Sequence, residues 1–398
     1  MQSEKHVLVR VRRVAALVLV VALSPVFGGS AAAQASAAAT AVPVRAVATF
    51  RALPARLSDS TFWNLITDIS EPGGYFRLTD NFTSNEMEVG ELSTMLRAAG
   101  VSGGVYLGVG PEQNLSYIAA IRPKMAFIVD IRRQAVMQHL MFKAVFELAK
   151  DRADFLALLF AKPRPAGIDS TTTIPKIWDA FRDVLTDTVL GRKTTARIEA
   201  HLTKTHGFTF TKDESAQLRL VLEAFQFFGP AISTQSGSGR GGRGVNRSFA
   251  EMTASYDYAG QTQSFLSTED NYRYVKALHE RNLIVAVSGD FGGPKAIRGI
   301  GAWLREQGGV VSAFYVSNVE QYLFQDGHAQ AFYDNVATLP VDARSVFIRP
   351  YSMRRFRPGG YSGDPSAQVR SLCPIEAFLR AVAAGRIQQN SDALACEP

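Results

Sequence analysis

The residues best placed for chemistry in this 398-residue chain form a glycine turn, Gly108-Val109-Gly110-Pro111-Glu112-Gln113-Asn114. It follows an apolar strand pattern at 104–107 and precedes a helix. A missing side chain lets a ligand approach the backbone, and free N–H groups at a helix start attract an anion or a carboxylate. Asp130 ends the next strand, 20 residues after Gly110, where an acid can bind ribose hydroxyls. The pattern predicts a nucleoside-type site formed by Gly108, Gly110, Glu112, Asn114 and Asp130.

Two alternatives stay open for this segment. In one, the turn is structural and Asp130 only pairs with Arg132 or Arg133. In the other, polar residues at the strand ends form a pocket that binds a polar solute, holds a hard cation or acts as a hydrolase. Ligands of open parallel sheets bind at the carboxyl ends of strands. The pocket candidates are therefore Glu112, Asn114, Asp130, Arg132, Asp290, Asn318, Glu320 and Arg349.

Other catalytic patterns have little support. There is no G-x-S-x-G nucleophile turn. The six histidines form no H-x-x-x-H pair, and His201 and His206 are five residues apart. Because zinc ligands on one helix usually recur at shorter spacings, the sequence predicts no metal site.

Hydrophobic periodicity predicts strands at 104–107, 125–129, 283–287, 310–316 and 344–348. Predicted helices cover 57–69, 84–99, 115–121, 134–150 with a continuation toward 160, 267–280 and 295–306. Strands that alternate with helices indicate an α/β protein with a doubly wound, mainly parallel, Rossmann-like sheet.

The expected organisation has five parts. Residues 1–35 read as a signal peptide and 36–56 as a flexible lead-in. Residues 57–165 and 261–398 form the α/β domain, the second part ending in a C-terminal tail. Residues 166–260 contain helical patterns such as 174–189 and a helix starting with Thr211, so they are expected to form a helical insertion. Within it, the Gly/Ser/Arg segment 235–247 has the composition of a flexible loop.

The chain resembles the class I S-adenosylmethionine-dependent methyltransferase fold over residues 106–130. It also resembles a bacterial family of exported, methyltransferase-like proteins over most of the chain beyond residue 35. The second resemblance runs through the segments DNFTSNE at 80–86, GVGPEQN at 108–114, FIVDIRR at 127–133, GDFGGPK at 289–295 and SNVEQY at 317–322.

The methyltransferase resemblance implies a cofactor, S-adenosylmethionine or a related nucleoside. Gly108 and Gly110 match the first two glycines of that pattern, and Asp130 matches its ribose-binding acid. Tyr106 stands where the pattern has an acid, and Glu112 stands where it has its third glycine. The carboxylate of Glu112 is then expected beside the methionine group of the cofactor, where it can bind the ammonium.

The first 35 residues have the three-part order of a secretory signal, with basic residues before an apolar run from Val14 to Phe27 and small residues up to Ala35. Their removal takes away four basic residues and one acid and lowers the formal net charge from +7 to +4. We therefore expect an exported protein with a small-molecule ligand, no stable membrane anchor after cleavage and no nucleic-acid partner. An oxidising compartment permits Cys373 and Cys396 to form a disulfide.

Overall fold

A six-stranded, mostly parallel sheet forms the centre of the protein. The computed structural model describes residues 52–76, 81–86, 88–234, 236, 247–349 and 372–396. The strands lie in the order β3-β2-β1-β4-β5-β6, and only the β5–β6 pair is antiparallel. They are β1 Val105–Gly108, β2 Met125–Asp130, β3 Ile284–Ser288, β4 Val311–Tyr315, β5 Val346–Ile348 and β6 Leu372–Pro374. The prediction of an α/β fold with five parallel strands is confirmed, and β6 was not predicted.

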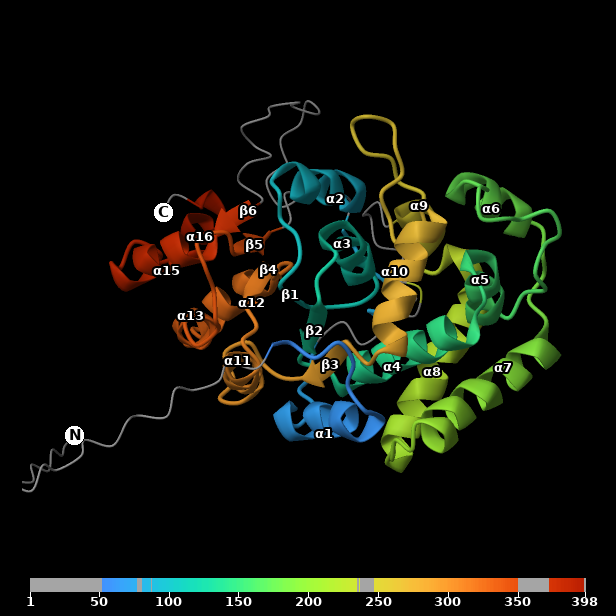
Figure 1. Ribbon diagram of the computed structural model, residues 1–398, viewed down its shortest axis with the longest axis horizontal. Helices are drawn as coiled ribbons and strands as arrows, with labels where there is room; N and C mark the ends of the chain where they lie inside the picture. The colour runs from blue at the N-terminus through green and yellow to red at the C-terminus, as the bar shows by residue number, and fades with distance from the viewer. Residues whose placement is uncertain are drawn as a thin grey trace, which may run out of the picture. The chain divides into compact units, whose positions relative to one another are not determined.

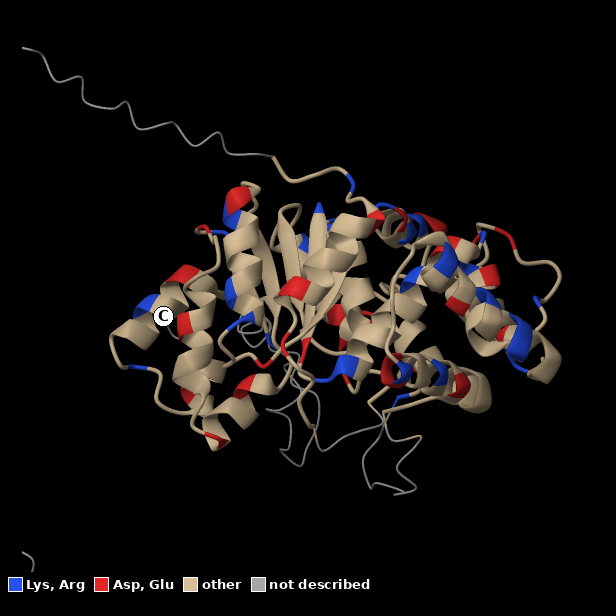
Figure 2. Cartoon of the chain, turned by 90° about the horizontal axis from the view of Figure 1, so that it is seen from below, with Lys and Arg blue, Asp and Glu red and all other residues tan. Residues whose placement is uncertain are grey.

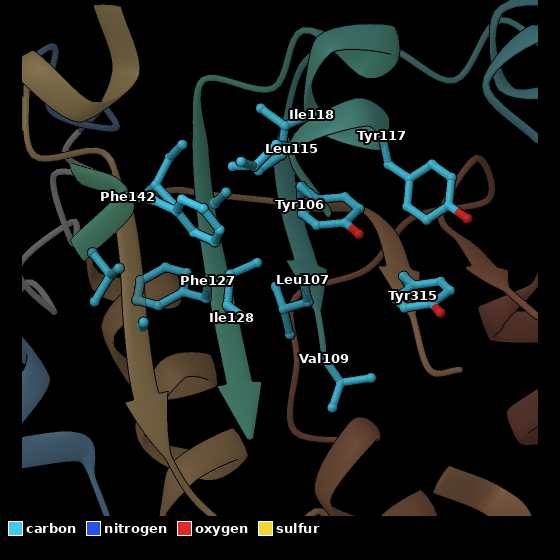
Figure 3. Packing of buried hydrophobic residues seen from close by; sticks show 14 of the residues in the cluster. Tyr106, Leu107, Val109, Leu115, Tyr117, Ile118, Phe127, Ile128, Phe142 and Tyr315 are labelled. Carbon is cyan, nitrogen blue, oxygen red and sulfur yellow. The ribbon is translucent and has the colours of Figure 1, made fainter. Parts of the chain in front are cut away.

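The central strands are apolar up to their last residues because helices cover both faces of the sheet. Every residue of β1, β2 and β3 is buried. Leu107 on β1 pairs in register with Phe127 on β2, and Phe142 lies against the same core (Figure 3). This core fixes the positions at which the three strands end.

Helices α3, α4 and α10 lie on one face of the sheet, and α1, α11 and α13 lie on the other (Figure 1). Ser58 and Thr268 accept hydrogen bonds from the first turns of α1 and α10 and so fix their starts. The helices associated with the sheet are α1 Asp59–Ile69, α2 Val89–Ala98, α3 Gln113–Ile121, α4 Arg133–Leu148, α10 Glu269–Glu280, α11 Ala296–Glu306, α12 Val319–Gln325, α13 Ala329–Val336, α15 Ile375–Ala383 and α16 Asn390–Ala395.

The described part of 166–260 contains helices and turns, and Tyr256 at its end forms a strand-like bridge with Thr262 just beyond it. The helices of this segment and α5 form a group that packs beside α4, mainly through α8. Basic and acidic residues are mixed along these helices (Figure 2). All described residues belong to one compact unit that spans Thr49–Pro398. These helices are α5 Arg152–Phe160, α6 Ile174–Phe181, α7 Thr188–Ala200, α8 Lys212–Phe228 and α9 Phe249–Thr253, with a 3₁₀ turn η2 at Gly229–Ala231.

A π-helical turn, η1, covers His201–Thr205 directly after α7. In a π turn, residues five apart lie above one another. The rings of His201 and His206 are therefore neighbours, with centroids 4.8 Å apart. A five-residue spacing makes no ligand pair on a regular α-helix, but this π turn brings the two rings together.

Several predicted helix bounds differ from the structure. The helix expected to run from 134 toward 160 ends at Leu148, and Asp151 caps the separate helix α5 with a side-chain bond to the N–H of Asp154. The helix expected over 84–99 begins at Val89, and the N–H of Ser84 donates to the side chain of Glu112. The predicted signal peptide, most of the lead-in and nearly all of the loop 235–247 lie outside the described residues.

The expected disulfide is present. Cys373 on β6 is bonded to Cys396 at the end of α16, with their Cα atoms 5.8 Å apart. The bond joins the edge of the sheet to the last described helix. Within the described ranges, none of the helices combines the length and the apolar composition needed to cross a bilayer.

Candidate functional site

A cavity of about 410 Å³ lies at the carboxyl ends of β1, β2, β3 and β4. This volume falls within the range of small-molecule pockets. The structure brings together five of the residues expected at strand ends, namely Gly110, Asp130, Arg132, Asp290 and Asn318. The other expected residues, Gly108, Glu112, Asn114, Glu320 and Arg349, are not part of the described cavity wall.

The glycine turn serves two different purposes. A Cβ at Gly108 would overlap Oδ1 of Asn114 and lie 2.8 Å from the hydroxyl of Tyr106. Gly108 is therefore needed for packing within the protein. Gly110 has a φ of +81°, and a Cβ there would approach only the amide of Gln113, at 3.4 Å. The backbone of Gly110 is thus the part of the turn that a ligand can approach.

The side chain of Asn114 stabilises the glycine turn through hydrogen bonds to its backbone. Its Oδ1 accepts a hydrogen bond from the hydroxyl of Tyr106 at 2.7 Å. Its Nδ2 donates to the carbonyl oxygens of Val109, Gly110 and Pro111 at 2.7–3.1 Å. Both side chains are fully buried. The tyrosine in place of the expected acid therefore supports the turn and contributes no ligand contact.

Gln113 lies in the cavity wall and has a buried hydrogen-bond acceptor without a partner. Its Nε2 donates to the carbonyl of Val109 at 2.9 Å, while its buried Oε1 has no partner. Gln113 lines the cavity and only 2% of the residue is exposed. A buried acceptor without a partner is costly to the folded state.

Asp130 forms a bidentate ion pair with Arg132. Oδ1 accepts from the backbone N–H of Arg132 at 2.9 Å and from its Nε at 3.0 Å, and Oδ2 accepts from Nη2 at 2.9 Å. The pairing expected in the structural alternative is therefore present. A carboxylate has about four acceptor positions, so Oδ2 retains capacity for one more donor.

The turn after β3 is already filled by a carboxylate of the chain itself. Glu71, which follows α1, accepts from the N–H groups of Lys295 at 2.8 Å, Ala296 at 2.9 Å and Asp290 at 3.2 Å. The N–H groups of Lys295 and Ala296 belong to the N-terminus of α11, a site that attracts anions. Asp290 lines the cavity, and its Oδ1 accepts from the N–H of Gly292 at 2.9 Å.

The end of β4 has a strained backbone beside the cavity. Ser317 has a φ of +48°, which is unfavourable for a residue with a side chain. Its hydroxyl and that of Tyr315 contact Oε1 of Glu86 at 3.1 and 2.5 Å. Burial raises the pKa of Glu86, although these two hydrogen bonds oppose the shift. Both Tyr315 and Ser317 line the cavity, so the buried acid fixes part of its wall.

Glu112 is directed away from the expected position beside the cofactor. Its Oε1 accepts from the N–H of Ser84 at 3.1 Å, and its Oε2 has no partner. Burial raises the pKa of Glu112 to about 8. The carboxyl is then neutral near pH 7 and does not offer a charge to an ammonium group.

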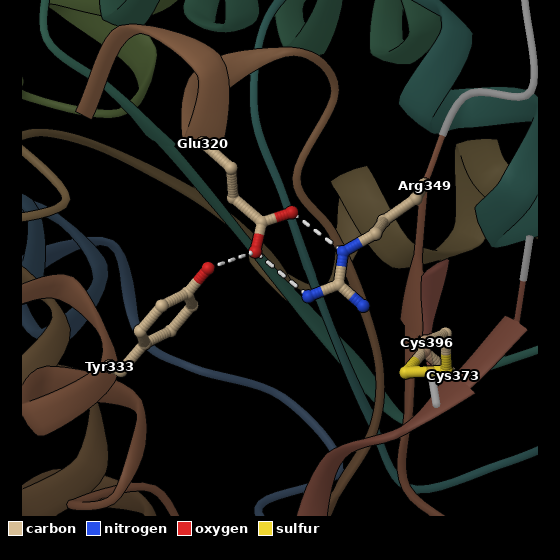
Figure 4. The surroundings of a disulfide bond; sticks show 5 residues. All are labelled: Glu320, Tyr333, Arg349, Cys373 and Cys396. Carbon is tan, nitrogen blue, oxygen red and sulfur yellow. Dashed lines mark hydrogen bonds and ion pairs between the residues drawn. A yellow bond between two sulfur atoms is a disulfide. The ribbon is translucent and has the colours of Figure 1, made fainter. Parts of the chain in front are cut away.

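Glu320 and Arg349 form a separate buried cluster near the disulfide (Figure 4). Nε of Arg349 donates to Oε2 of Glu320 at 2.6 Å and Nη2 donates to Oε1 at 2.8 Å. The hydroxyl of Tyr333 donates to the same Oε1 at 2.9 Å. The guanidinium also lies over the rings of Phe347 and Phe378. This arrangement joins β5 to α12 and α13 and leaves neither charge for the cavity.

Sequence reasoning missed the outer wall of the cavity. Tyr75, Phe76, Tyr322 and His328 line it from the segments after α1 and around α12. The rings of Phe76 and Tyr322 meet edge to face with centroids 5.5 Å apart, and Tyr75 is 80% exposed. The only sequence signal was the Gly73-Gly74-Tyr75-Phe76 run, which places aromatic residues after a helix-ending glycine pair.

Fold and site together define an α/β protein with a ligand-sized cavity at the carboxyl edge of a mostly parallel sheet. The chain belongs to a family described as a domain of unknown function, DUF7790, whose model matches residues 81–368. This range contains the cavity residues after β1, β2, β3 and β4. A comparison with curated proteins found no match.

Proposed function

We propose that this protein binds an adenosyl-type nucleoside, S-adenosylmethionine or a close relative, in the strand-end cavity. The observation that carries the proposal is the position of Gly110 and Asp130 on one cavity wall at the ends of β1 and β2. The strand order 3-2-1-4-5 supports a doubly wound, Rossmann-like sheet, in which ligands bind where the chain crosses from one side of β1 to the other.

The hydrogen-bonding groups of the cavity complement such a ligand. Oε1 of Gln113, Oδ2 of Asp130 and the carboxylate of Asp290 are acceptors, and a nucleoside offers ribose hydroxyls and an exocyclic amine as donors. The described cavity wall contains three acids, Asp130, Asp290 and Asp326, and one arginine, Arg132. This excess of acids favours a cationic ligand, such as one that contains a sulfonium.

The acidic-pocket alternative has less support. It requires Glu112, Asp290 and Glu320 to converge, and only Asp290 lines the cavity. Glu112 is buried against Ser84, and Glu320 is paired with Arg349. A general acid and base pair built from these three carboxyls does not form.

Export of the protein is part of the proposal. The signal pattern of residues 1–35 predicts it, and the disulfide between Cys373 and Cys396 suits an oxidising compartment. Sequencing of the N-terminus of protein from the native organism tests this. We expect the chain to begin just after Ala35, and an intact Met1 in the cytoplasmic fraction would contradict it.

Calorimetric titration with S-adenosylmethionine and S-adenosylhomocysteine tests the ligand. Substitution of Asp130 is a poor test because it also removes the partner of Arg132. Gln113→Leu is cleaner, because the carbonyl of Val109 keeps its bond from Asn114. We expect Gln113→Leu to weaken binding about tenfold, the value of one hydrogen bond near 1.4 kcal/mol.

The matched control is Gln330→Leu, which removes an exposed glutamine that contacts Asp334. It should leave affinity unchanged. No heat of binding from either nucleoside at millimolar concentration would refute the proposal, as would equal affinities of the wild type and Gln113→Leu.

A further inference from the structure

A second group of functional side chains lies where η1 meets the end of α4 and the start of α1. Glu147 is in the last turn of α4, and His201 and His206 stand at either end of the π turn. Nε2 of each histidine lies 2.7 Å from the same oxygen, Oε2 of Glu147. The three ligand atoms lie within 4.8 Å of one another.

The contacts of His206 indicate that a positive charge belongs in this cluster. Its Nδ1 lies 2.7 Å from Oδ1 of Asp59, and its Nε2 faces Glu147. A neutral imidazole has one N–H donor, so it cannot donate to both carboxylates. Either the ring is an imidazolium, or a cation lies between Nε2 and the carboxylate of Glu147.

We propose that Glu147, His201 and His206 bind a divalent transition-metal ion of the zinc class. Two imidazole nitrogens and one carboxylate oxygen are a ligand set of zinc sites that keep a fourth position for water. Tetrahedral bonds of about 2.0–2.1 Å place ligand atoms about 3.3 Å apart. The 2.7 Å contacts therefore need to open by only about 0.6 Å.

The surroundings of the three ligands match those of metal centres. Asp59 accepts from Nδ1 of His206 and would fix its tautomer, as carboxylates behind metal-bound histidines do. Asp59 is itself held by Nδ2 of Asn282 at 2.8 Å. Nζ of Lys143 binds Oε1 of Glu147 at 2.6 Å, which leaves Oε2 as the single ligand oxygen.

Access and ring orientation are also suitable. The side chain of His201 is 18% exposed and that of Glu147 is 8% exposed, so an ion and one water can reach an otherwise buried site. The ring of His206 stacks on Phe208 at 5.1 Å, which limits its rotation. The cluster is separate from the strand-end cavity, because the described cavity wall contains none of Asp59, Glu147, His201 and His206.

The test is cobalt and zinc binding to the purified full-length protein after removal of metal with a chelator. We expect one Co²⁺ per chain, with the visible absorption of a four- or five-coordinate ion, and displacement of that ion by Zn²⁺. His201→Ala should weaken binding at least 100-fold, and its partly exposed position makes a folding defect small. Asp59→Asn should weaken binding about 10- to 100-fold through the orientation of His206.

Glu147→Gln provides a second ligand variant, and Glu306→Gln is its matched control, because Glu306 is an exposed carboxylate outside the cluster. The control should bind one Co²⁺ as the wild type does. No Co²⁺ or Zn²⁺ bound by the wild type at micromolar free metal would overturn the proposal. Equal binding by the wild type, His201→Ala and Glu147→Gln would overturn it as well, because the metal would then lie elsewhere.

Discussion

The buried carboxyl of Glu112 should make stability depend on pH in a measurable way. Its pKa is about 8 in the folded protein, against 4.5 for an ordinary glutamate, because burial disfavours the charged form. The folded state therefore holds a proton that the unfolded chain releases between these values. The stabilising contribution of the neutral carboxyl is complete below pH 4.5 and is lost as the pH rises through 8.

In the window between pH 4.5 and 8 this single proton lowers the free energy of unfolding by about 1.4 kcal/mol per pH unit. From pH 5.5 to 7.0 the loss is about 2 kcal/mol. Glu112→Gln cannot titrate, and its Oε1 can still accept from Ser84. We therefore expect the wild type to lose about 2 kcal/mol more than Glu112→Gln over this pH interval.

Urea unfolding of both proteins at pH 5.5, 6.2 and 7.0 measures this difference. The wild type and Glu112→Gln contain the same histidines, so any contribution of these residues cancels in the difference between the two pH slopes. Glu306→Gln, which removes an exposed carboxylate, should keep the wild-type slope. If the wild type and Glu112→Gln show the same slope, Glu112 is ionised in the folded protein and the explanation of its position is wrong.

Three further outcomes follow from packing and pairing. Gly108→Ala should destabilise the protein by about 3 kcal/mol in urea unfolding, because the added methyl overlaps Asn114; an unchanged midpoint would contradict this. Glu320→Ala should lower the free energy of unfolding by about 3–5 kcal/mol, because it leaves Arg349 buried without its partner. The double variant Glu320→Leu, Arg349→Met should lose less, because it removes both charges. Cys373→Ser should cost about 3 kcal/mol and make the melting temperature insensitive to dithiothreitol.

The sheet was largely predictable because its strands are short, continuous apolar segments. Residues 125–129 were expected and Met125–Asp130 is observed, and 283–287 corresponds to Ile284–Ser288. β6 was not predicted because Leu372–Pro374 has only three residues and includes a proline. Such a segment has the sequence pattern of an irregular C-terminal tail. Its position depends on pairing with β5, which sequence periodicity does not reveal.

The candidate site was predictable only as a set of strand ends. Asp130 and Asp290 reach the cavity because the sheet brings strand ends together. Glu112 and Glu320 also follow strands, but each lies at the start of a helix that turns its side chain into the protein. The direction of a side chain depends on partners distant in sequence, such as Ser84 for Glu112 and Arg349 for Glu320.

The carboxylate of Glu71 occupies the N–H groups at the start of α11 and so competes with any ligand anion for them. Being tethered, it has a high effective concentration at the N–H groups of Lys295 and Ala296. A ligand phosphate would have to displace Glu71, together with the end of α1, before it could bind this loop. If the proposed nucleoside binds in the cavity, Glu71 would disfavour a phosphate group at this loop, because the N–H groups that could bind the phosphate are already occupied.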